Sequence, residues 1–141
     1  MLNKKTVFVV DDDVAVLRSL KRLLNASGFW VEVFESAEAF CESAIPEHGL
    51  CVVIDINLKT SSGIELRRQL TASGSTLPVI FVTANDSEHA RRAAIDAGCI
   101  AYLRKPFAAQ SLFDAIRRAA NAPAQQMAHQ SFATTQQRVT R

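Results

Sequence analysis

The sequence contains few residues of the kinds that crosslink small domains or bind soft metals. Three cysteines, at positions 41, 51 and 99, and three histidines occur in 141 residues. The cysteines are too few and too far apart for a disulfide framework, and the histidines share no ligand spacing. The composition therefore argues against a disulfide-rich secreted domain and against a zinc-binding domain.

Long apolar runs and an excess of one charge are also missing. The longest apolar runs, such as 6–10 and 50–54, have the length of strands, well below the roughly 20 residues that cross a bilayer. Residues 1–120 contain equal numbers of basic and acidic residues, and the net charge of +2 comes from Arg138 and Arg141. The amino terminus does not resemble a signal peptide. We therefore expect a cytoplasmic protein whose chain contacts neither a membrane nor, by itself, nucleic acid.

The residues that are present alternate between apolar runs and amphipathic helical patterns. The expected strands cover 6–10, 30–34, 50–54, 77–82 and 100–103. The first and last helices are expected over 14–25 and 109–120, and three further helices are expected to start at Ser36, at Ser62 and at the cap segment 85–88. This alternation predicts an α/β fold with a doubly wound, five-stranded parallel sheet covered by helices on both faces.

Local signals refine this expectation. Asp13 precedes the first helix and is expected to be its N-cap, while Gly28 is expected to end it. The pairs of adjacent arginines at 67–68, 91–92 and 117–118 are expected to lie on solvated helix faces. After residue 121 the composition becomes rich in glutamine and alanine. We therefore expect a folded domain over 1–121 and a disordered tail or linker over 122–141.

Polar side chains follow the expected strands at the point where each strand ends. Asp11 and Asp12 follow the first strand, Asp55 the third, Thr83 the fourth, and Lys105 comes shortly after the fifth. Because the carboxyl ends of parallel strands meet at one edge of the sheet, these side chains are expected to converge there. Clustered carboxylates suit Mg²⁺, which would also allow an aspartate oxygen to attack an incoming phosphoryl group.

Five short motifs in this order resemble the receiver domain of two-component response regulators, and residues 28–40 most resemble FixJ-type receivers. The resemblance implies a (βα)5 flavodoxin-like fold and a phosphoacceptor at Asp55. It places the switch hydroxyl at Thr83, with Ala84 behind it, and the aromatic switch residue at Tyr102. The lysine that pairs with the phosphoryl group is Lys105, in the sequence Lys-Pro-Phe.

The resemblance also implies a metal site and a backbone feature. Mg²⁺ would be bound by Asp11, Asp12, Asp55 and the backbone carbonyl of Asn57, and the peptide bond before Pro106 would be cis. The family commonly has Met-Pro at the third and fourth positions after its phosphoacceptor, where this chain has Leu-Lys at 58–59. Replacement of that proline is expected to loosen the loop.

The partners implied are a sensor histidine kinase or phosphotransfer protein as donor, and a downstream protein or a missing effector domain as output. FixJ-type receivers usually regulate transcription through an attached helix-turn-helix domain. The surface formed by the helix that starts at the cap segment 85–88, the strand 100–103 and the helix 109–120 would carry the output and could form a homodimer. The chain would not be an enzyme, apart from its own phosphotransfer and dephosphorylation.

Two other functions fit parts of the sequence. The apolar strand followed by Asp11, Asp12 and Asp13 also resembles haloacid-dehalogenase-type phosphatases, with Asp11 as nucleophile and Asp13 as acid. That family usually has Thr or Val where this chain has Ala15. The second alternative is a protein-binding module that acts without phosphate.

Overall fold

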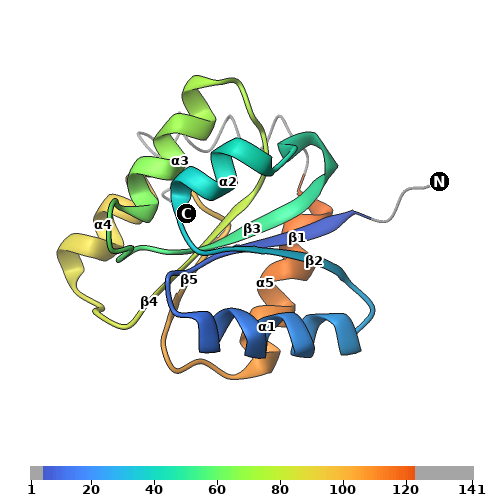
Figure 1. Cartoon of the computed structure of the whole chain (residues 1–141). Helices are drawn as coiled ribbons and strands as arrows, with labels where there is room; N and C mark the ends of the chain where they lie inside the picture. Colours follow the sequence, from blue (N-terminus) through green and yellow to red (C-terminus); the bar gives the residue numbers. More distant parts are fainter. Residues whose placement is uncertain (1–4, 123–141) are drawn as a thin grey trace.

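The computed structural model describes residues 5–122 and shows five parallel strands in one sheet (Figure 1). The strands are β1 (Thr6–Val10), β2 (Trp30–Phe34), β3 (Gly49–Asp55), β4 (Val79–Thr83) and β5 (Ala101–Arg104). Their spatial order is β2-β1-β3-β4-β5. The strand order reverses between β1 and β3. The carboxyl ends of these two strands therefore lie side by side at the carboxyl end of the sheet, which is called its carboxyl edge below. The predicted fold class is confirmed.

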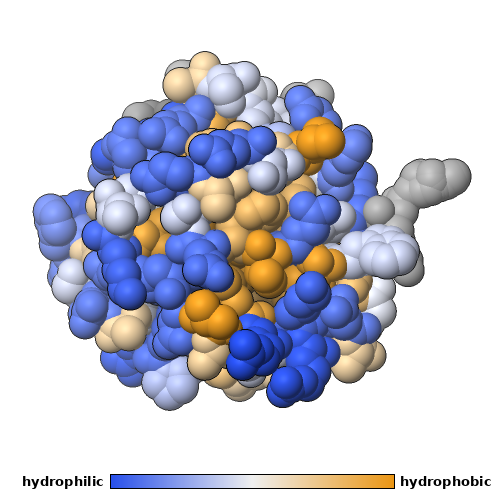
Figure 2. Space-filling model, viewed as in Figure 1, coloured by the Kyte–Doolittle hydropathy of each residue, from blue (hydrophilic) through white to orange (hydrophobic). Residues whose placement is uncertain are grey.

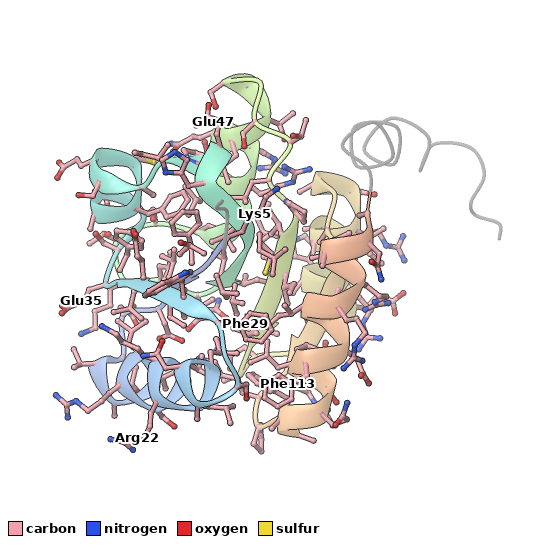
Figure 3. All side chains as sticks on the ribbon, turned by 90° about the vertical axis from the view of Figure 1, so that its right-hand side faces the viewer. Lys5, Arg22, Phe29, Glu35, Glu47 and Phe113 are labelled. Carbon is pink, nitrogen blue, oxygen red and sulfur yellow. The ribbon has the colours of Figure 1, made fainter. Side chains whose placement is uncertain are left out.

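Helices cover both faces of the sheet (Figure 1). They are α1 (Val14–Ala26), α2 (Ala37–Ser43), α3 (Gly63–Ala72), α4 (Glu88–Ala97) and α5 (Ala109–Asn121). Buried side chains of α1 and α5 pack on one face, and those of α2, α3 and α4 pack on the other. Figure 3 shows Phe29 and Phe113 on the α1 and α5 side, where both are partly buried.

The ends of α1 form as the sequence predicts. The Oδ1 atom of Asp13 accepts hydrogen bonds from the backbone N–H groups of Ala15, at 3.0 Å, and Val16, at 3.4 Å. These contacts satisfy donors that the first helical turn leaves without intrahelical partners. Past the other end, Gly28 adopts a φ of +95°, a conformation that costs glycine little.

Strand β3 extends one residue beyond the prediction at each end and β5 is shifted by one residue, and two larger differences lie elsewhere. Strand β4 begins at Val79 and not at 77, because Pro78 has no N–H to donate to the neighbouring strand. A short 3-10 helix, Pro46–His48, was not predicted; it begins with a proline, a residue suited to the first helical position. Both features lie where β3 and β4 begin, at the end of the sheet opposite the aspartates.

The prediction of a solvated Arg67 is wrong. This side chain is only 2% exposed, and its Nε–H group donates to the carbonyls of Ala97, at 3.2 Å, and Gly98, at 2.8 Å. Arg67 lies on the same side of α3 as the buried residues Ile64 and Leu70, at the three-residue spacing of one helix face. Its guanidinium therefore links α3 to the end of α4, whereas the other paired arginines are exposed.

The edge strand β2 is less covered than the rest of the sheet. Val31, Val33 and Phe34 are only partly buried, and Trp30 is 58% exposed. Figure 2 shows hydrophobic residues gathered between α1 and α2, where β2 runs. Within residues 5–122, no helix has both the length and the apolar character needed to span a membrane. The predicted tail beyond residue 122 lies outside the described residues.

Candidate functional site

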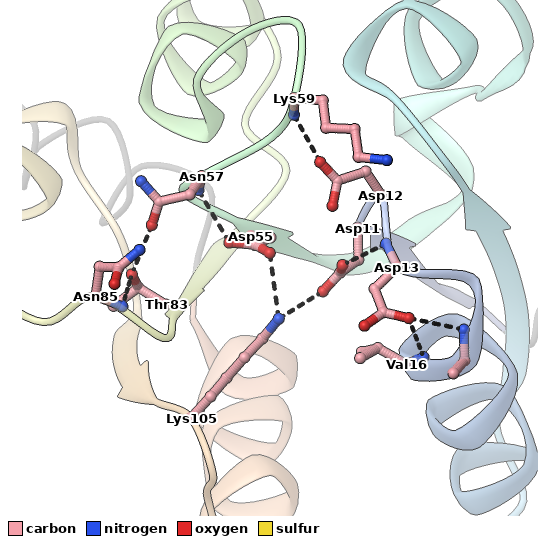
Figure 4. A network of polar contacts seen from close by, with 11 residues as sticks. Asp11, Asp12, Asp13, Val16, Asp55, Asn57, Lys59, Thr83, Asn85 and Lys105 are labelled. Carbon is pink, nitrogen blue, oxygen red and sulfur yellow. Dashed lines mark hydrogen bonds and ion pairs between the residues drawn. The ribbon is translucent and has the colours of Figure 1, made fainter.

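Three carboxylates meet at the carboxyl edge of the sheet (Figure 4). Asp11 and Asp12 follow β1 directly, and Asp55 is the last residue of β3. Asp11 is 2% exposed and Asp55 is 7% exposed, while Asp12 is partly exposed. One carboxylate oxygen from each residue lies within 4.8 Å of the other two. The adjacent positions of β1 and β3 in the sheet produce this cluster.

Lys105 brings a positive charge to the cluster from the segment after β5. Its Nζ atom lies 2.8 Å from Oδ2 of Asp11 and 3.2 Å from Oδ2 of Asp55. Burial lowers the pKa of the ammonium, but its hydrogen bond and charge interaction with Asp11, together with those with Asp55, outweigh burial and raise it. Lys105 therefore stays charged at neutral pH, and its peptide bond to Pro106 is cis.

Asp55 is held through both of its oxygens. Its Oδ1 atom accepts the backbone N–H of Asn57 at 2.9 Å, and its Oδ2 atom faces Lys105. Burial raises the pKa of the Asp55 carboxyl, and the charge of Asp11 adds to the increase. The contacts with Asn57 and Lys105 lower the pKa without cancelling the effect of burial. The ionised form of Asp55 is therefore less favourable in the folded protein than in the unfolded chain, and ionisation of this group costs stability.

This cost predicts a pH dependence of stability in protein kept free of metal by a chelator. Because the Asp55 pKa is raised above 3.8 on folding, the folded state binds more protons than the unfolded state as the pH rises above that value. The protonated Asp55 carboxyl makes its full contribution to the stability of the folded state below pH 3.8. This contribution is lost as the pH rises through the folded-state pKa. Denaturant unfolding at several pH values should show this loss in the wild type and not in Asp55→Asn. Parallel stability curves for the two proteins would contradict the prediction.

Thr83, at the end of β4, is fully buried and is linked to two asparagines. Its hydroxyl donates to Oδ1 of Asn57 at 3.0 Å and accepts the backbone N–H of Asn85 at 3.0 Å. The predicted role of Asn57 was limited to its backbone carbonyl, and this side-chain contact was not predicted. A polar residue two positions after Asp55 was the only available signal. Asn57 thus contacts both Asp55 and Thr83.

The loop after β3 makes one contact that a proline at position 59 would not allow. The backbone N–H of Lys59 donates to Oδ2 of Asp12 at 2.6 Å. A proline at this position has no N–H and could not make that hydrogen bond. Leu58, beside it, is 8% exposed and packs in the core. Lysine at position 59 therefore ties the loop to the acidic cluster.

No hydrogen bond joins Tyr102 to the three clustered carboxylates in the described part of the chain. Its side chain is partly buried, and its hydroxyl donates to Oδ1 of Asp86 at 2.9 Å, in the loop between β4 and α4. Ala84 is exposed at the start of the same loop. Asp86 was predicted only as part of a helix-cap segment, in which Ser87 is the N-cap of α4.

The donor set of the cluster fits a hard divalent cation. Mg²⁺ binds oxygen ligands at about 2.1 Å, so that two of its ligands lie at most about 4.2 Å apart. Oxygens of Asp11, Asp12 and Asp55 lie within 4.8 Å of one another, close to that separation. No histidine or cysteine belongs to this group. An oxygen-rich cluster of this kind favours magnesium over zinc.

The architecture and the edge cluster together define a flavodoxin-like (βα)5 domain with an acidic site at the carboxyl ends of its strands. A profile of the response regulator receiver domain matches residues 7–117. The chain belongs to the family of response regulator receiver domains, and the predicted membership is confirmed.

Individual relatives agree with this assignment. The transcriptional regulatory protein TdiR of Thauera aromatica is 40% identical over 118 residues, which are 83% of this chain and 52% of TdiR. The response regulator protein TodT of Pseudomonas putida is 33% identical over 120 residues, which are 85% of this chain and 53% of TodT. The chain thus spans about half the length of these curated relatives.

Two solved structures are similar to this chain over most of its length. The crystal structure of FixJ-N has a TM-score of 0.78 and 33% sequence identity, and the match covers 86% of this chain and 98% of FixJ-N. The structure of the response regulator StyR has a TM-score of 0.73 and 41% identity, over 94% of this chain and 65% of StyR.

Proposed function

We propose that Asp55 is the phosphoacceptor of this receiver and that phosphorylation switches the binding of a partner. The observation that carries the proposal is the setting of the Asp55 carboxylate, which lies between the N–H of Asn57 and the ammonium of Lys105 and beside two further aspartates. The N–H and the ammonium orient this carboxylate and supply positive charge, and the neighbouring aspartates can hold a cation that neutralises an incoming dianion. We propose Asp11, Asp12, Asp55 and the backbone carbonyl of Asn57 as the ligands of Mg²⁺.

In the phosphotransfer step, one carboxylate oxygen of Asp55 forms a bond to phosphorus as the bond from phosphorus to the donor's leaving group breaks. Bound Mg²⁺ would supply charge neutralisation at the transferring group. Lys105 already contacts Oδ2 of Asp55 and would move onto a phosphoryl oxygen as a point charge. Thr83 would turn its hydroxyl from Asn57 to the same group. The chain performs no other chemistry in this proposal.

The phosphodonor in this proposal is a sensor histidine kinase or a phosphotransfer protein. An open, mainly apolar groove borders Lys105, and its lining includes Val16, Leu20, Pro106 and Phe107. This groove gives a donor protein a surface to contact next to the acceptor. The output would be a downstream protein or an effector domain beyond this chain, reached through the α4-β5-α5 face. A homodimer through that face is a further proposal.

The two alternatives differ in how they use Asp11. In a haloacid-dehalogenase-type phosphatase Asp11 would be the nucleophile, and its carboxylate, like that of Asp55, is hydrogen-bonded to Lys105 and to one backbone N–H, so that Asp13 is the residue that separates the two schemes. Asp13, the acid in that scheme, caps α1 instead. A binding module that needs no phosphate would leave the acceptor site without a use.

Intact mass spectrometry after incubation with acetyl phosphate and MgCl₂ tests the proposal. The wild type is expected to gain one labile phosphoryl group and Asp55→Asn to gain none, because an amide oxygen cannot act as the acceptor. Asp114→Asn, an exposed change on α5, is the control and should behave as the wild type. Phosphorylation of Asp55→Asn would refute Asp55 as acceptor. A wild type that is phosphorylated neither by acetyl phosphate nor by any of a panel of histidine kinases would favour the phosphate-independent module.

A further inference from the structure

Asp86 makes an unusual set of contacts in the loop between β4 and α4. Its Oδ1 atom accepts the hydroxyl of Tyr102 at 2.9 Å, and its Oδ2 atom lies 2.9 Å from Nη2 of Arg91. Nη1 of Arg104 is 3.9 Å from the same carboxylate. The Asp86 side chain is 17% exposed, although it lies in a surface loop. One carboxylate thus joins residues of α4 and β5.

Arg91 completes the arrangement around Tyr102. The guanidinium carbon of Arg91 lies 5.3 Å from the centroid of the Tyr102 ring, within the range of a cation–π contact. One oxygen of the Asp86 carboxylate accepts a hydrogen bond from this arginine, and the other accepts the hydroxyl of Tyr102. The tyrosine is therefore held in its present orientation by both its hydroxyl and its ring.

A short path connects this cluster to the proposed phosphorylation site. The Thr83 hydroxyl accepts the backbone N–H of Asn85, the residue that precedes Asp86. If that hydroxyl turns towards a phosphoryl group on Asp55, its hydrogen-bond geometry with Asn85 changes and the loop has to rearrange. Asp86 is carried by the same loop. A movement of Thr83 is therefore transmitted to the carboxylate that holds Tyr102.

We propose that Asp86 is a positioning residue that holds Tyr102 and Arg91 in the unphosphorylated arrangement and couples them to Thr83. This inference rests on the proposed function of Asp55. It identifies the contact that opposes the switch, because any state in which Tyr102 turns away must break the hydrogen bond to Asp86. A contact present in only one of two states shifts the equilibrium between them.

The test combines a signal from Tyr102 with an equilibrium affinity. Tyr102 is the single tyrosine of the chain, so ¹³C-labelled tyrosine gives ring signals from this residue alone. Beryllium fluoride with MgCl₂ serves as a stable mimic of a phosphoryl group on a carboxylate. The variants are Asp86→Ala and Asp86→Asn, in which the amide can still accept the tyrosine hydroxyl but carries no charge. Asp114→Ala is the matched control, since Asp114 also binds an arginine and a side-chain N–H but no tyrosine.

Asp86→Ala is expected to shift the Tyr102 signals in the absence of ligand and to tighten beryllium fluoride binding by about two- to fivefold, the range typical of a partly exposed charged contact. Asp86→Asn should show a smaller effect, and Asp114→Ala none. Unchanged tyrosine signals, or shifted signals with an unchanged affinity, would overturn the proposal. A wild type that binds no beryllium fluoride would instead refute the proposed function of Asp55, and the coupling with it.

Discussion

Gly63→Ala is expected to destabilise the protein by about 3 kcal/mol, near the upper end of the usual cost of overpacking a core. A Cβ atom at Gly63 would lie 2.5 Å from the backbone oxygen of Asp55 and 2.6 Å from Cγ2 of Ile54. The oxygen belongs to the end of β3 and cannot rotate away as a side chain would. Relief of the clash requires the start of α3 to move away from the strand that carries the acceptor. Thermal unfolding should show a loss of roughly 10 °C in the midpoint.

Gly74→Ala separates this steric cost from a conformational one. No atom lies within 4 Å of a Cβ added at Gly74, but its φ is +85°, so alanine there should cost only about 1 kcal/mol. If Gly63→Ala were as stable as the wild type, or no less stable than Gly74→Ala, the close approach of α3 to β3 would be contradicted. Because the clash involves Asp55 itself, Gly63→Ala should also slow phosphorylation by acetyl phosphate.

Lys105→Met is expected to tighten Mg²⁺ binding by roughly tenfold and to destabilise the metal-free protein by about 2 kcal/mol. The substitution removes the ammonium that lies 2.8 Å from Asp11 and 3.2 Å from Asp55, so three carboxylates then lie together without that counterion. Removal of one partner from a buried ion pair is strongly destabilising. The 20% exposure of the Lys105 side chain reduces the cost through solvent screening.

Calorimetric titration with MgCl₂ and thermal unfolding in chelator and in MgCl₂ measure both effects. A ligand that binds only the folded state stabilises it more as the ratio of ligand concentration to Kd increases. Because Lys105→Met is expected to have the lower Kd, Mg²⁺ should raise its unfolding midpoint more than that of the wild type. Lys21→Met, on the exposed side of α1, is the control for loss of a lysine. Equal Mg²⁺ affinity in the wild type and Lys105→Met would show that Lys105 does not compete with the cation for the carboxylates.

Most of the fold was predictable because it depends on local pattern. Strands such as Thr6–Val10 are short apolar runs, as expected for strands covered on both faces. The caps at Asp13, Ser36 and Ser62 were readable because a side chain in a helix N-cap bonds to backbone groups two or three residues away. The prediction was less precise where one residue changes the hydrogen-bonding pattern, as Pro78 does at the start of β4.

The contacts around the site were less predictable because each joins segments that are distant in sequence. Arg67 was assigned to solvent from its charge, although its position on α3 places it against Ala97 and Gly98 of the neighbouring segment. The partner of Tyr102 depends on the path of the loop before α4. These contacts follow from the packing of elements and from loop conformation, which a residue pattern does not specify.

By itself, the sequence determined that this chain forms a parallel α/β sheet with aspartates, a threonine and a lysine at one edge. It did so because parallel strands all end on the same side, so that residues following separate strands converge without further information. Only the tertiary structure decided how these groups are paired: Lys105 between Asp11 and Asp55, Thr83 on Asn57, Lys59 on Asp12, and Asp86 on Tyr102. Hydrogen bonds and ion pairs require atomic distances of about 3 Å, and those distances are set when helices and loops pack onto the sheet.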